Sequence, residues 1–215
     1  MKIKIKKKVF LINSPNIIED FLDSVAEDDD LNEDKIPYWS ELWPSSLMLG
    51  KFILTHPHIF REKRCLDLGC GLGLVSMALK LSQAIVYSQD IMFESLVFLK
   101  NNFSKNKIPY PVCIQGDWRY PCFKKNSLDI IVASDVLYER RFHVPILTFI
   151  NYTLKQSGAV YITTPKREGA WDFFKKATSY NLTSYLIKKN SIYLNKITTQ
   201  IYLWKFIPTN VLSLS

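Results

Sequence analysis

The sequence predicts an α/β fold: a seven-stranded, mostly parallel sheet with helices on both faces and one antiparallel edge strand. Three observations lead to this expectation. Short apolar runs alternate with amphipathic segments between residues 64 and 178, as successive strand-helix units do. A glycine-rich turn joins the first of these runs to the helix after it. Two apolar runs near the C-terminus then close the sheet, antiparallel to each other.

Each element follows from its local pattern of apolar residues. Pro44 suits the first turn of a helix, so a helix is placed directly after it. We expect helices over residues 17–26, 45–55, 72–82, 93–105, 142–154 and 168–178. We expect strands over residues 64–69, 84–89, 111–115, 128–134, 158–164, 184–187 and 199–206. The basic N-terminus alternates Lys and Ile, as an edge strand does. Nothing divides the chain, so we expect one domain over residues 1–215, with 1–43 as an N-terminal extension.

Composition and cysteine usage narrow the class of protein. The chain has 215 residues, enough for one α/β domain with a large core. The apolar run at residues 9–12 is too short for a signal peptide, and no stretch approaches the length of a membrane span. The four cysteines form no C-x-x-C pair and lie mostly in apolar or glycine contexts. They indicate reduced core residues of a cytoplasmic protein, and no metal site is expected.

Charge is distributed unevenly along the chain, which has a formal net charge of +8. Residues 27–34 hold six acids, whereas the first eight residues hold five lysines. From residue 151 onward there are nine Lys or Arg against two acids. A C-terminal part with this excess of positive charge can bind an acidic protein surface or nucleic acid. The alternative is an ordinary solvated face, which the scattered spacing of the lysines favours.

The glycine-rich turn carries the strongest functional signal. Asp67, Gly69, Gly71 and Gly73 form the pattern D-x-G-x-G-x-G between a strand and a helix, where glycine lets a ligand approach the backbone closely. The Asp67 charge, and Leu74 where G-x-G-x-x-G requires glycine, argue against a dinucleotide. A ligand with an amine or cationic end fits better. The pattern resembles the first motif of Rossmann-like S-adenosylmethionine (AdoMet) methyltransferases; the alternative is a tight turn without a ligand.

Acidic residues also follow the next two strands. Asp90 ends the second apolar run, where its carboxylate can accept both hydroxyls of a ribose. Asp117 ends the third run, where it can accept from an adenine amino group while Trp118 covers the ring. Singly, each acid is more often a helix cap or a turn former. Three acids at successive strand ends of one nucleotide-binding fold favour the cofactor interpretation.

The run after the fourth strand makes the resemblance specific. The run Ala133-Ser134-Asp135-Val136-Leu137-Tyr138 is similar to the post-strand motif of the family 16 seven-β-strand methyltransferases, which include many protein lysine methyltransferases. Gly116-Asp117-Trp118 and the segment Pro37–Pro44 match further motifs of that family, and Lys166-Arg167-Glu168 with Phe173-Phe174 match more weakly. The resemblance covers residues 36–178 and is nearest to the electron-transfer-flavoprotein β-subunit lysine methyltransferase group.

The resemblance implies a set of site residues. Asp135 would align the acceptor amine and Tyr138 would hydrogen-bond it. Trp39 and Glu41 would form a lid over the substrate, whereas anchoring of the N-terminal segment is the alternative for this aromatic cluster. The implied cofactor-binding residues are Trp43, Asp67, Gly69, Gly71, Gly73, Asp90, Ile91, Asp117, Trp118 and Ser134.

The expected function is transfer of a methyl group from AdoMet to a lysine side chain of a protein by a cytoplasmic monomer that does not bind membranes. A small-molecule or nucleic-acid methyltransferase on the same fold is the first alternative. Nucleic-acid amino-methyltransferases typically carry Asn-Pro-Pro-Tyr or Asp-Pro-Pro-Tyr after strand four, and residues 134–137 lack the prolines. Pro121-Cys122 resembles the nucleophile of cytosine-5 methyltransferases but precedes strand four. A non-catalytic interaction protein is the second alternative.

Overall fold

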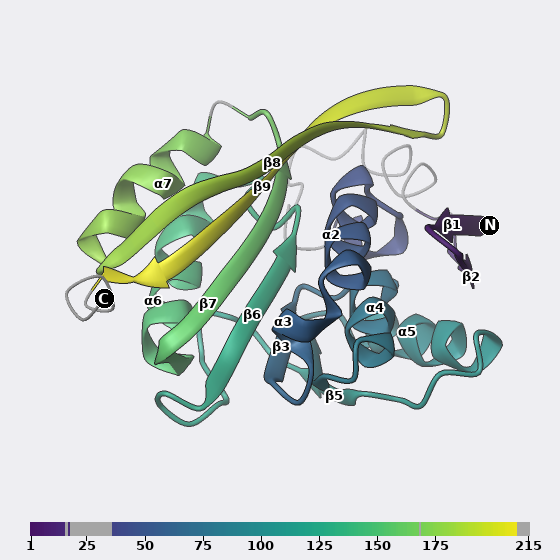
Figure 1. Cartoon of the computed structure of the whole chain (residues 1–215), viewed down its shortest axis with the longest axis horizontal. Helices are drawn as coiled ribbons and strands as arrows, with labels where there is room; N and C mark the ends of the chain where they lie inside the picture. Colours follow the sequence, from purple (N-terminus) through teal and green to yellow (C-terminus); the bar gives the residue numbers. More distant parts are fainter. Residues whose placement is uncertain (16, 18–35, 168, 210–215) are drawn as a thin grey trace.

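The computed structural model describes residues 1–15, 17, 36–167 and 169–209. Its main sheet has seven strands in the order β5-β4-β3-β6-β7-β9-β8 (Figure 1). The predicted fold class is confirmed. The helix expected over residues 17–26 and the acidic run at 27–34 lie outside the described residues, apart from Ile17.

Five strands of this sheet are parallel to one another. They are β3 (Arg64–Leu68), β4 (Ile85–Asp90), β5 (Val112–Gln115), β6 (Leu128–Ser134) and β7 (Leu154–Pro165). The order reverses between β3 and β6, the point at which open α/β sheets form a ligand-binding crevice at the carboxyl ends of the strands.

The two closing strands form a hairpin that is longer than expected. β9 (Ile197–Pro208) is inserted antiparallel between β7 and the outermost strand β8 (Leu182–Leu194). Asn195 and Lys196 connect them with φ angles of 49° and 63°, both left-handed, as a two-residue hairpin turn of type I′ requires. The far part of the hairpin runs past the end of the sheet and over α2 (Figure 1).

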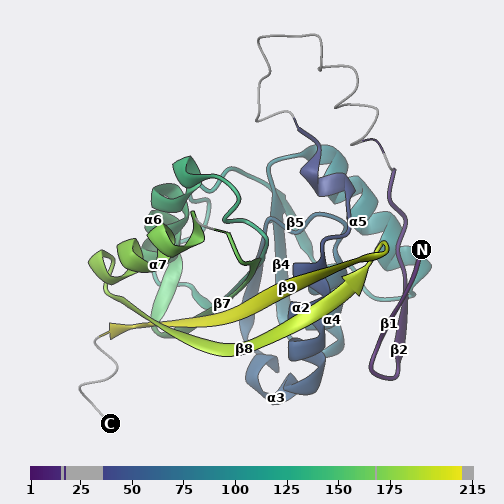
Figure 2. The same cartoon turned by 90° about the horizontal axis from the view of Figure 1, so that it is seen from above.

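Helices cover both faces of the sheet (Figure 2). One face is covered by α2 (Pro44–Thr55), α4 (Leu74–Leu81) and α5 (Phe93–Lys105), and the other by α6 (His143–Thr153) and α7 (Ala170–Ser179). Alternation along each strand explains this division. Leu66 and Ile131 pack in the cluster beneath α6 and α7, whereas their neighbours Cys65 and Val132 pack in the cluster beneath α2 and α4.

Three short helices complete the described part of the chain: η2 (Tyr38–Ser40), α3 (Pro57–Phe60) and η3 (Arg140–Phe142). The first of these helices precedes α2, and the last begins the connection that leads into α6. Both bring aromatic side chains to the carboxyl ends of the strands.

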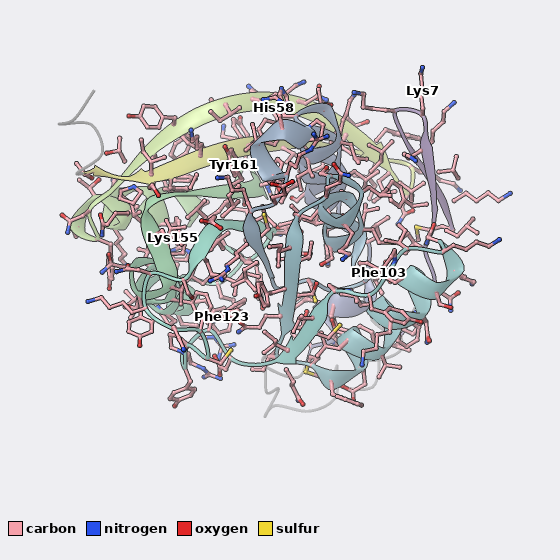
Figure 3. The ribbon with its side chains drawn as sticks, turned by 60° about the horizontal axis from the view of Figure 1, so that its bottom comes forward. Lys7, His58, Phe103, Phe123, Lys155 and Tyr161 are labelled. Carbon is pink, nitrogen blue, oxygen red and sulfur yellow. The ribbon has the colours of Figure 1, made fainter. Side chains whose placement is uncertain are left out.

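The basic N-terminus forms a strand, as expected, but in a sheet of its own. β1 (Lys2–Ile5) pairs antiparallel with β2 (Lys8–Leu11), and this hairpin is separate from the main sheet. Its isoleucines are buried, whereas Lys7 points away from the molecule at the turn (Figure 3). Asn106, which follows the last residue of α5, accepts a hydrogen bond from Leu11 N and donates one to the Leu11 carbonyl oxygen, which fixes the hairpin against that helix.

Candidate functional site

A cleft lies at the carboxyl ends of β3, β4 and β6, beneath η2 and the first turn of α2. It encloses about 1130 Å³ of space not filled by protein, its open mouth included, which suits a nucleotide-sized ligand. Of the predicted site residues, only Asp67 does not line it. Those that do are Trp39, Glu41, Trp43, Gly69, Gly71, Gly73, Asp90, Ile91, Asp117, Trp118, Ser134, Asp135 and Tyr138.

The glycine-rich turn forms one wall of the cleft. Gly71 has a φ of 48°, and its backbone N–H donates to Asp90 Oδ2 at 2.9 Å. Gly73 has a φ of 85°, and a Cβ there would lie 2.7 Å from Leu99 Cγ. Glycine is therefore required at both positions, at Gly71 by the turn and at Gly73 also by the close approach of α5.

Asp67 lies behind this turn. Its carboxylate is fully buried, with Oδ2 accepting from Ser76 Oγ at 2.6 Å, and Ser76 in turn contacts Ser88 Oγ at 2.7 Å. Burial raises the pKa of Asp67 to about 7. Strand alternation turns this side chain toward α4, so Asp67 does not line the cleft. Its Oδ1 is buried and has no hydrogen-bond partner among the described residues, and its contact with a cofactor stays a prediction.

Asp90 is held by backbone N–H groups. In addition to the Gly71 contact, its Oδ1 accepts from Met92 N at 3.1 Å, and the residue is 8% exposed. Burial raises the pKa of Asp90, although these hydrogen bonds oppose the shift. Each carboxylate oxygen keeps a second lone pair for a ligand hydroxyl. Ile91, beside it, is 47% exposed and offers an apolar surface at the cleft.

Asp117 and Trp118 occupy the far end of the cleft. Arg119, which the sequence did not single out, forms an ion pair with Asp117 at 2.6 Å and donates its backbone N–H to Asp117 Oδ1 at 2.8 Å. Trp118 packs edge-on against Phe142 with ring centroids 5.2 Å apart. The indole is therefore fixed in orientation beside the carboxylate, while its contact with adenine stays a prediction.

Asp135 is held by side chains from two other elements. Arg167 Nη2 donates to its Oδ1 at 3.2 Å, and Ser45 Oγ donates to its Oδ2 at 3.3 Å. The Asp135 side chain is 7% exposed, and its φ of 60° is left-handed, which is uncommon for a residue other than glycine. Burial raises the pKa of Asp135, and the Arg167 guanidinium opposes that effect. The sequence did not identify Ser45 or Arg167 as its partners.

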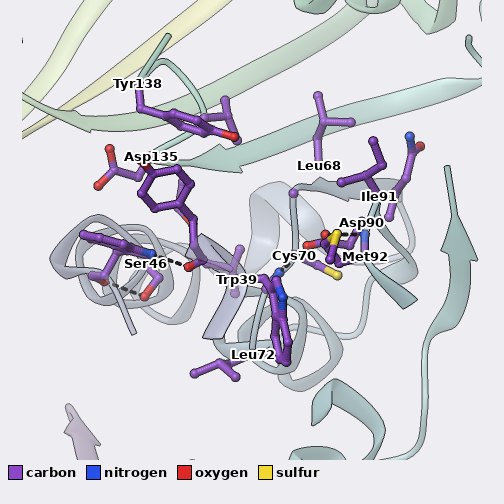
Figure 4. A pocket seen from close by; sticks show the side chains of 18 of the residues that line it. Trp39, Ser46, Leu68, Cys70, Leu72, Asp90, Ile91, Met92, Asp135 and Tyr138 are labelled. Carbon is purple, nitrogen blue, oxygen red and sulfur yellow. Dashed lines mark hydrogen bonds between the residues drawn. The ribbon is translucent and has the colours of Figure 1, made fainter. Parts of the chain in front are cut away.

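Aromatic side chains line the cleft beside Asp135. Tyr138 packs against Tyr38 with ring centroids 5.0 Å apart, and Trp43 Nε1 donates to the Tyr38 carbonyl oxygen at 2.8 Å. Burial and the nearby Glu139 raise the pKa of Tyr138. Figure 4 shows Asp135 and Tyr138 on one side of the cleft and Asp90 with Met92 on the other.

Trp39 anchors the N-terminal segment and also lines the cleft, while its role as a lid over the substrate stays a prediction. The residue is 8% exposed and packs on Phe98 of α5 at 5.5 Å, so it anchors the segment before α2. It also lines the cleft, and its carbonyl oxygen lies 3.5 Å from the position of a Cβ on Gly71. A lid that opened at Trp39 would therefore have to break core packing.

Two hydrogen-bond donors in the cleft have no partner in the described part of the chain, and they fit a cofactor that contains a nucleoside. Trp39 Nε1 and Gln89 Nε2 are buried and have no hydrogen-bond partner among the described residues, and both residues line the cleft. Such buried N–H groups are costly unless a ligand acceptor pairs with them. Together with the Asp90 carboxylate, which can accept from a diol, they are compatible with the adenosine and ribose groups of AdoMet.

The geometry does not support Cys122 as a nucleophile. Cys122 does not line the cleft, and burial raises the pKa of its thiol, whereas a reactive cysteine needs a lowered one. All four cysteines are free. Within the described ranges there is no group of three or more His, Cys, Asp or Glu that could hold a metal ion, and no helix has the length and apolarity to cross a membrane.

Solved structures share this architecture. The structure of magnesium protoporphyrin IX methyltransferase from Synechocystis PCC 6803, which has bound SAM, matches with a TM-score of 0.60 at 14% identity, over 92% of this chain and 98% of that one. At that identity the likeness establishes the fold. Occupation of this cleft by S-adenosylmethionine stays a prediction, which the unpartnered donors Trp39 Nε1 and Gln89 Nε2 support.

Curated relatives are similar in sequence as well. The human electron transfer flavoprotein beta subunit lysine methyltransferase is 30% identical over 105 residues, which are 48% of this chain and 39% of the relative. The Mus musculus protein of the same name is 26% identical over 175 residues, which are 80% of this chain and 68% of the relative. The match to the human protein thus spans well under half of that protein's length. The family model described as lysine methyltransferase matches residues 31–180, and the chain belongs to this family.

Proposed function

We propose that this protein transfers a methyl group from AdoMet to the side-chain amine of a lysine in a protein. The observation that carries the proposal is the Asp135 carboxylate, 7% exposed, placed beside the aromatic pair of Tyr138 and Tyr38 at the cleft. Family membership and the names of the relatives, which are protein lysine methyltransferases, support the same acceptor.

AdoMet supplies an electrophilic methyl group on a sulfonium centre. The chain has to bring a neutral amine into line with that group, because a lysine with a pKa of about 10.4 is almost fully protonated near pH 7. The aromatic side chains at Tyr38 and Tyr138 lower the polarity around the amine and so favour its neutral form. The lysine ammonium, once paired with Asp135, loses one proton to solvent before it attacks. The Asp135 carboxylate orients the neutral amine through its N–H groups; as the new N–C bond forms, the S–C bond breaks to leave a thioether, and Asp135 stabilises the methylated ammonium.

Tyr138 serves as a hydrogen-bonding group and not as a base. Its raised pKa keeps the phenol protonated at neutral pH, so it cannot remove the proton from the incoming ammonium. It can hold the nitrogen through its oxygen lone pairs and donate its own hydrogen to a neighbouring acceptor. We assign it to positioning of the acceptor nitrogen, together with Asp135.

The other half of the cleft holds the cofactor in this proposal. Asp90 accepts the ribose hydroxyls, and Asp117 with Trp118 holds the adenine. The open backbone at Gly71 brings the cofactor against the turn, while Trp43 and Glu41 cover it from the segment before α2. Asp67 contributes from behind by tying the turn to α4 through Ser76.

A labelling experiment tests the proposal. Cell lysate incubated with this protein and labelled AdoMet is resolved on a gel with and without protease, and we expect protease-sensitive label. Asp135→Asn keeps the side-chain shape but removes the charge, so the label should fall about tenfold. Asp129→Asn is the matched control, because Asp129 pairs with Lys155 at 2.6 Å near the other end of β6.

Two outcomes would contradict the proposal. Label that survives protease and disappears with ribonuclease would make RNA the acceptor. Equal labelling by the parent protein and by Asp135→Asn would remove Asp135 from the acceptor site.

We extend the proposal to compartment and assembly. A reducing compartment, the cytoplasm, is supported by the four free cysteines. A monomer is supported by the cleft, whose two sides come from one chain. Activity that follows the monomer peak in size-exclusion chromatography is the expected result.

A further inference from the structure

The acceptor carboxylate already carries a cation from its own chain. Arg167 Nη2 lies 3.2 Å from Asp135 Oδ1, the group that the proposed function gives to the lysine ammonium. Two cations cannot share one carboxylate edge without repulsion, so a lysine that enters the cleft competes with Arg167. The Arg167 side chain is 40% exposed, whereas Asp135 is 7% exposed, so Arg167 is the partner that can turn outward.

A small groove adjoins the Arg167 side chain. Arg167 also lines this groove, which lies between the end of β7, the start of α7 and β9 and includes Trp171, Tyr202 and Trp204. Trp171 is 46% exposed and packs edge-on against Trp204 at 6.0 Å. Arg167 Nε is buried and has no hydrogen-bond partner in the described part of the chain. The guanidinium therefore keeps a donor for a further acceptor.

The charges around this groove favour an acidic group as that acceptor. Lys166 lines the groove and is exposed. Asp172 is already paired with Arg140 at 3.3 Å. Lys189 Nζ lies 5.4 Å from the ring centroid of Tyr202, which also lines the groove. A carboxylate on a bound protein thus meets a surface of opposite charge, and Arg binds carboxylates with two parallel hydrogen bonds.

We propose that Arg167 is a specificity-determining residue that selects lysines with an acidic residue close by in the substrate. The substrate carboxylate binds the Arg167 guanidinium and draws it toward the groove. The ammonium group of the target lysine then pairs with Asp135 in place of Arg167. Two ion pairs exist after this exchange where one existed before, so the buried Asp135 carboxylate is never left without a cation. A substrate that lacks the acid has to displace Arg167 without compensation. This inference rests on the proposed function and names its substrate class.

Peptide pairs test the proposal. Each pair presents one lysine in a Gly/Ser background, with Asp or Asn at one position within three residues on either side of the lysine. We expect the parent protein to methylate the best Asp peptide with a kcat/KM about tenfold or more above that of its Asn twin, mainly through KM. Arg167→Gln should remove the preference by raising KM for the Asp peptide and leaving the Asn peptide equal or better. Arg167→Lys should restore part of it.

The control is Lys175→Gln, which removes one positive charge from an exposed position of α7 outside the groove. It should keep the full preference. A preference that persists in Arg167→Gln, or equal rates on Asp and Asn peptides with the parent protein, overturns the role of Arg167 while lysine methylation stands. If neither the peptides nor lysate proteins gain a methyl group on lysine, the proposed function falls and this inference falls with it.

Discussion

Asp90 and Asp135 lie at the carboxyl ends of two strands and face each other across the cleft, yet the protein holds them by different means. Backbone N–H groups of Gly71 and Met92 hold Asp90, so its position follows from the main chain of the turn itself. Side chains of Ser45 and Arg167 hold Asp135, and each comes from a different element. A carboxylate fixed by backbone suits a constant cofactor. One held by side chains can exchange a partner for an incoming cation.

The largest expected effect is that of replacing Asp90, which backbone N–H groups hold. Asp90→Ala removes the acceptor for a ribose diol and leaves the Gly71 N–H without its partner, so AdoMet affinity should fall by about tenfold to a hundredfold. Isothermal titration calorimetry measures this loss. Circular dichroism confirms that the variant is folded, and an unchanged Kd in a folded variant would remove the cofactor assignment of this side.

A smaller effect is expected from replacing Asp135, which side chains hold, and it should appear in turnover instead of AdoMet affinity. Asp135→Asn should leave the AdoMet Kd within about twofold of the parent value, while turnover falls by about tenfold or more through loss of a charged contact in the transition state. Calorimetry and initial rates on one preparation separate the two quantities. A parallel loss of affinity would mean that Asp135 belongs to the cofactor side, and the contrast with Asp90 would break.

A third carboxylate, that of Asp67, differs from both in its expected effect on stability as pH changes. Burial raises the pKa of Asp67 from 3.8 to about 7, so the native state keeps the proton that the unfolded chain has already lost. The stability from this group is complete below pH 4 and is lost as pH rises through about 7. The unfolding free energy of the parent protein should therefore decline between pH 4 and about pH 7, by an amount on the order of a few kcal/mol from this group. Asp67→Asn should remove that part of the decline. Equal slopes in chemical denaturation of parent and variant would contradict the burial assigned to Asp67.

The smallest expected effect is that of salt on docking. The lysine-rich region from residue 173 to residue 209 should attract acidic protein substrates, so methylation at substrate concentrations below KM should slow severalfold as the Debye length falls from about 10 Å to about 3 Å. Because AdoMet binding depends on contacts inside the cleft, it should change less. Calorimetry at matched salt concentrations provides that control, and a salt-independent rate on a protein substrate would exclude steering.

The difference between Asp90 and Asp135 also explains which parts of the fold and the site the sequence could predict. The strand-helix alternation and the glycine turn are local patterns, and the carboxyl ends of parallel strands meet at one edge, so Asp90, Asp117 and Asp135 could be placed together. The partners of Asp135 could not be found in this way. Ser45 is 90 residues away and Arg167 is 32 away, and no local pattern specifies how α2 and the β7–α7 connection meet.

Two further differences have equally physical causes. The direction of the Asp67 side chain depends on which face of β3 packs on α4. The sequence does not reveal this face, because the strand is an apolar run that is buried on both faces. The length of the β8–β9 hairpin was missed because most of β8 is exposed, so apolar alternation fades along it. Pairing across the hairpin and a turn with two left-handed residues hold it together instead.

Mass spectrometry of the methylated product is the most direct measurement of which group the protein methylates. The parent protein is incubated with isotopically labelled AdoMet and lysate, and the label is mapped by peptide sequencing, with Asp135→Asn and Asp129→Asn treated in parallel. We expect label on lysine side chains of proteins, greatly reduced by Asp135→Asn and unchanged by Asp129→Asn. Label found only in small molecules or RNA would contradict this expectation.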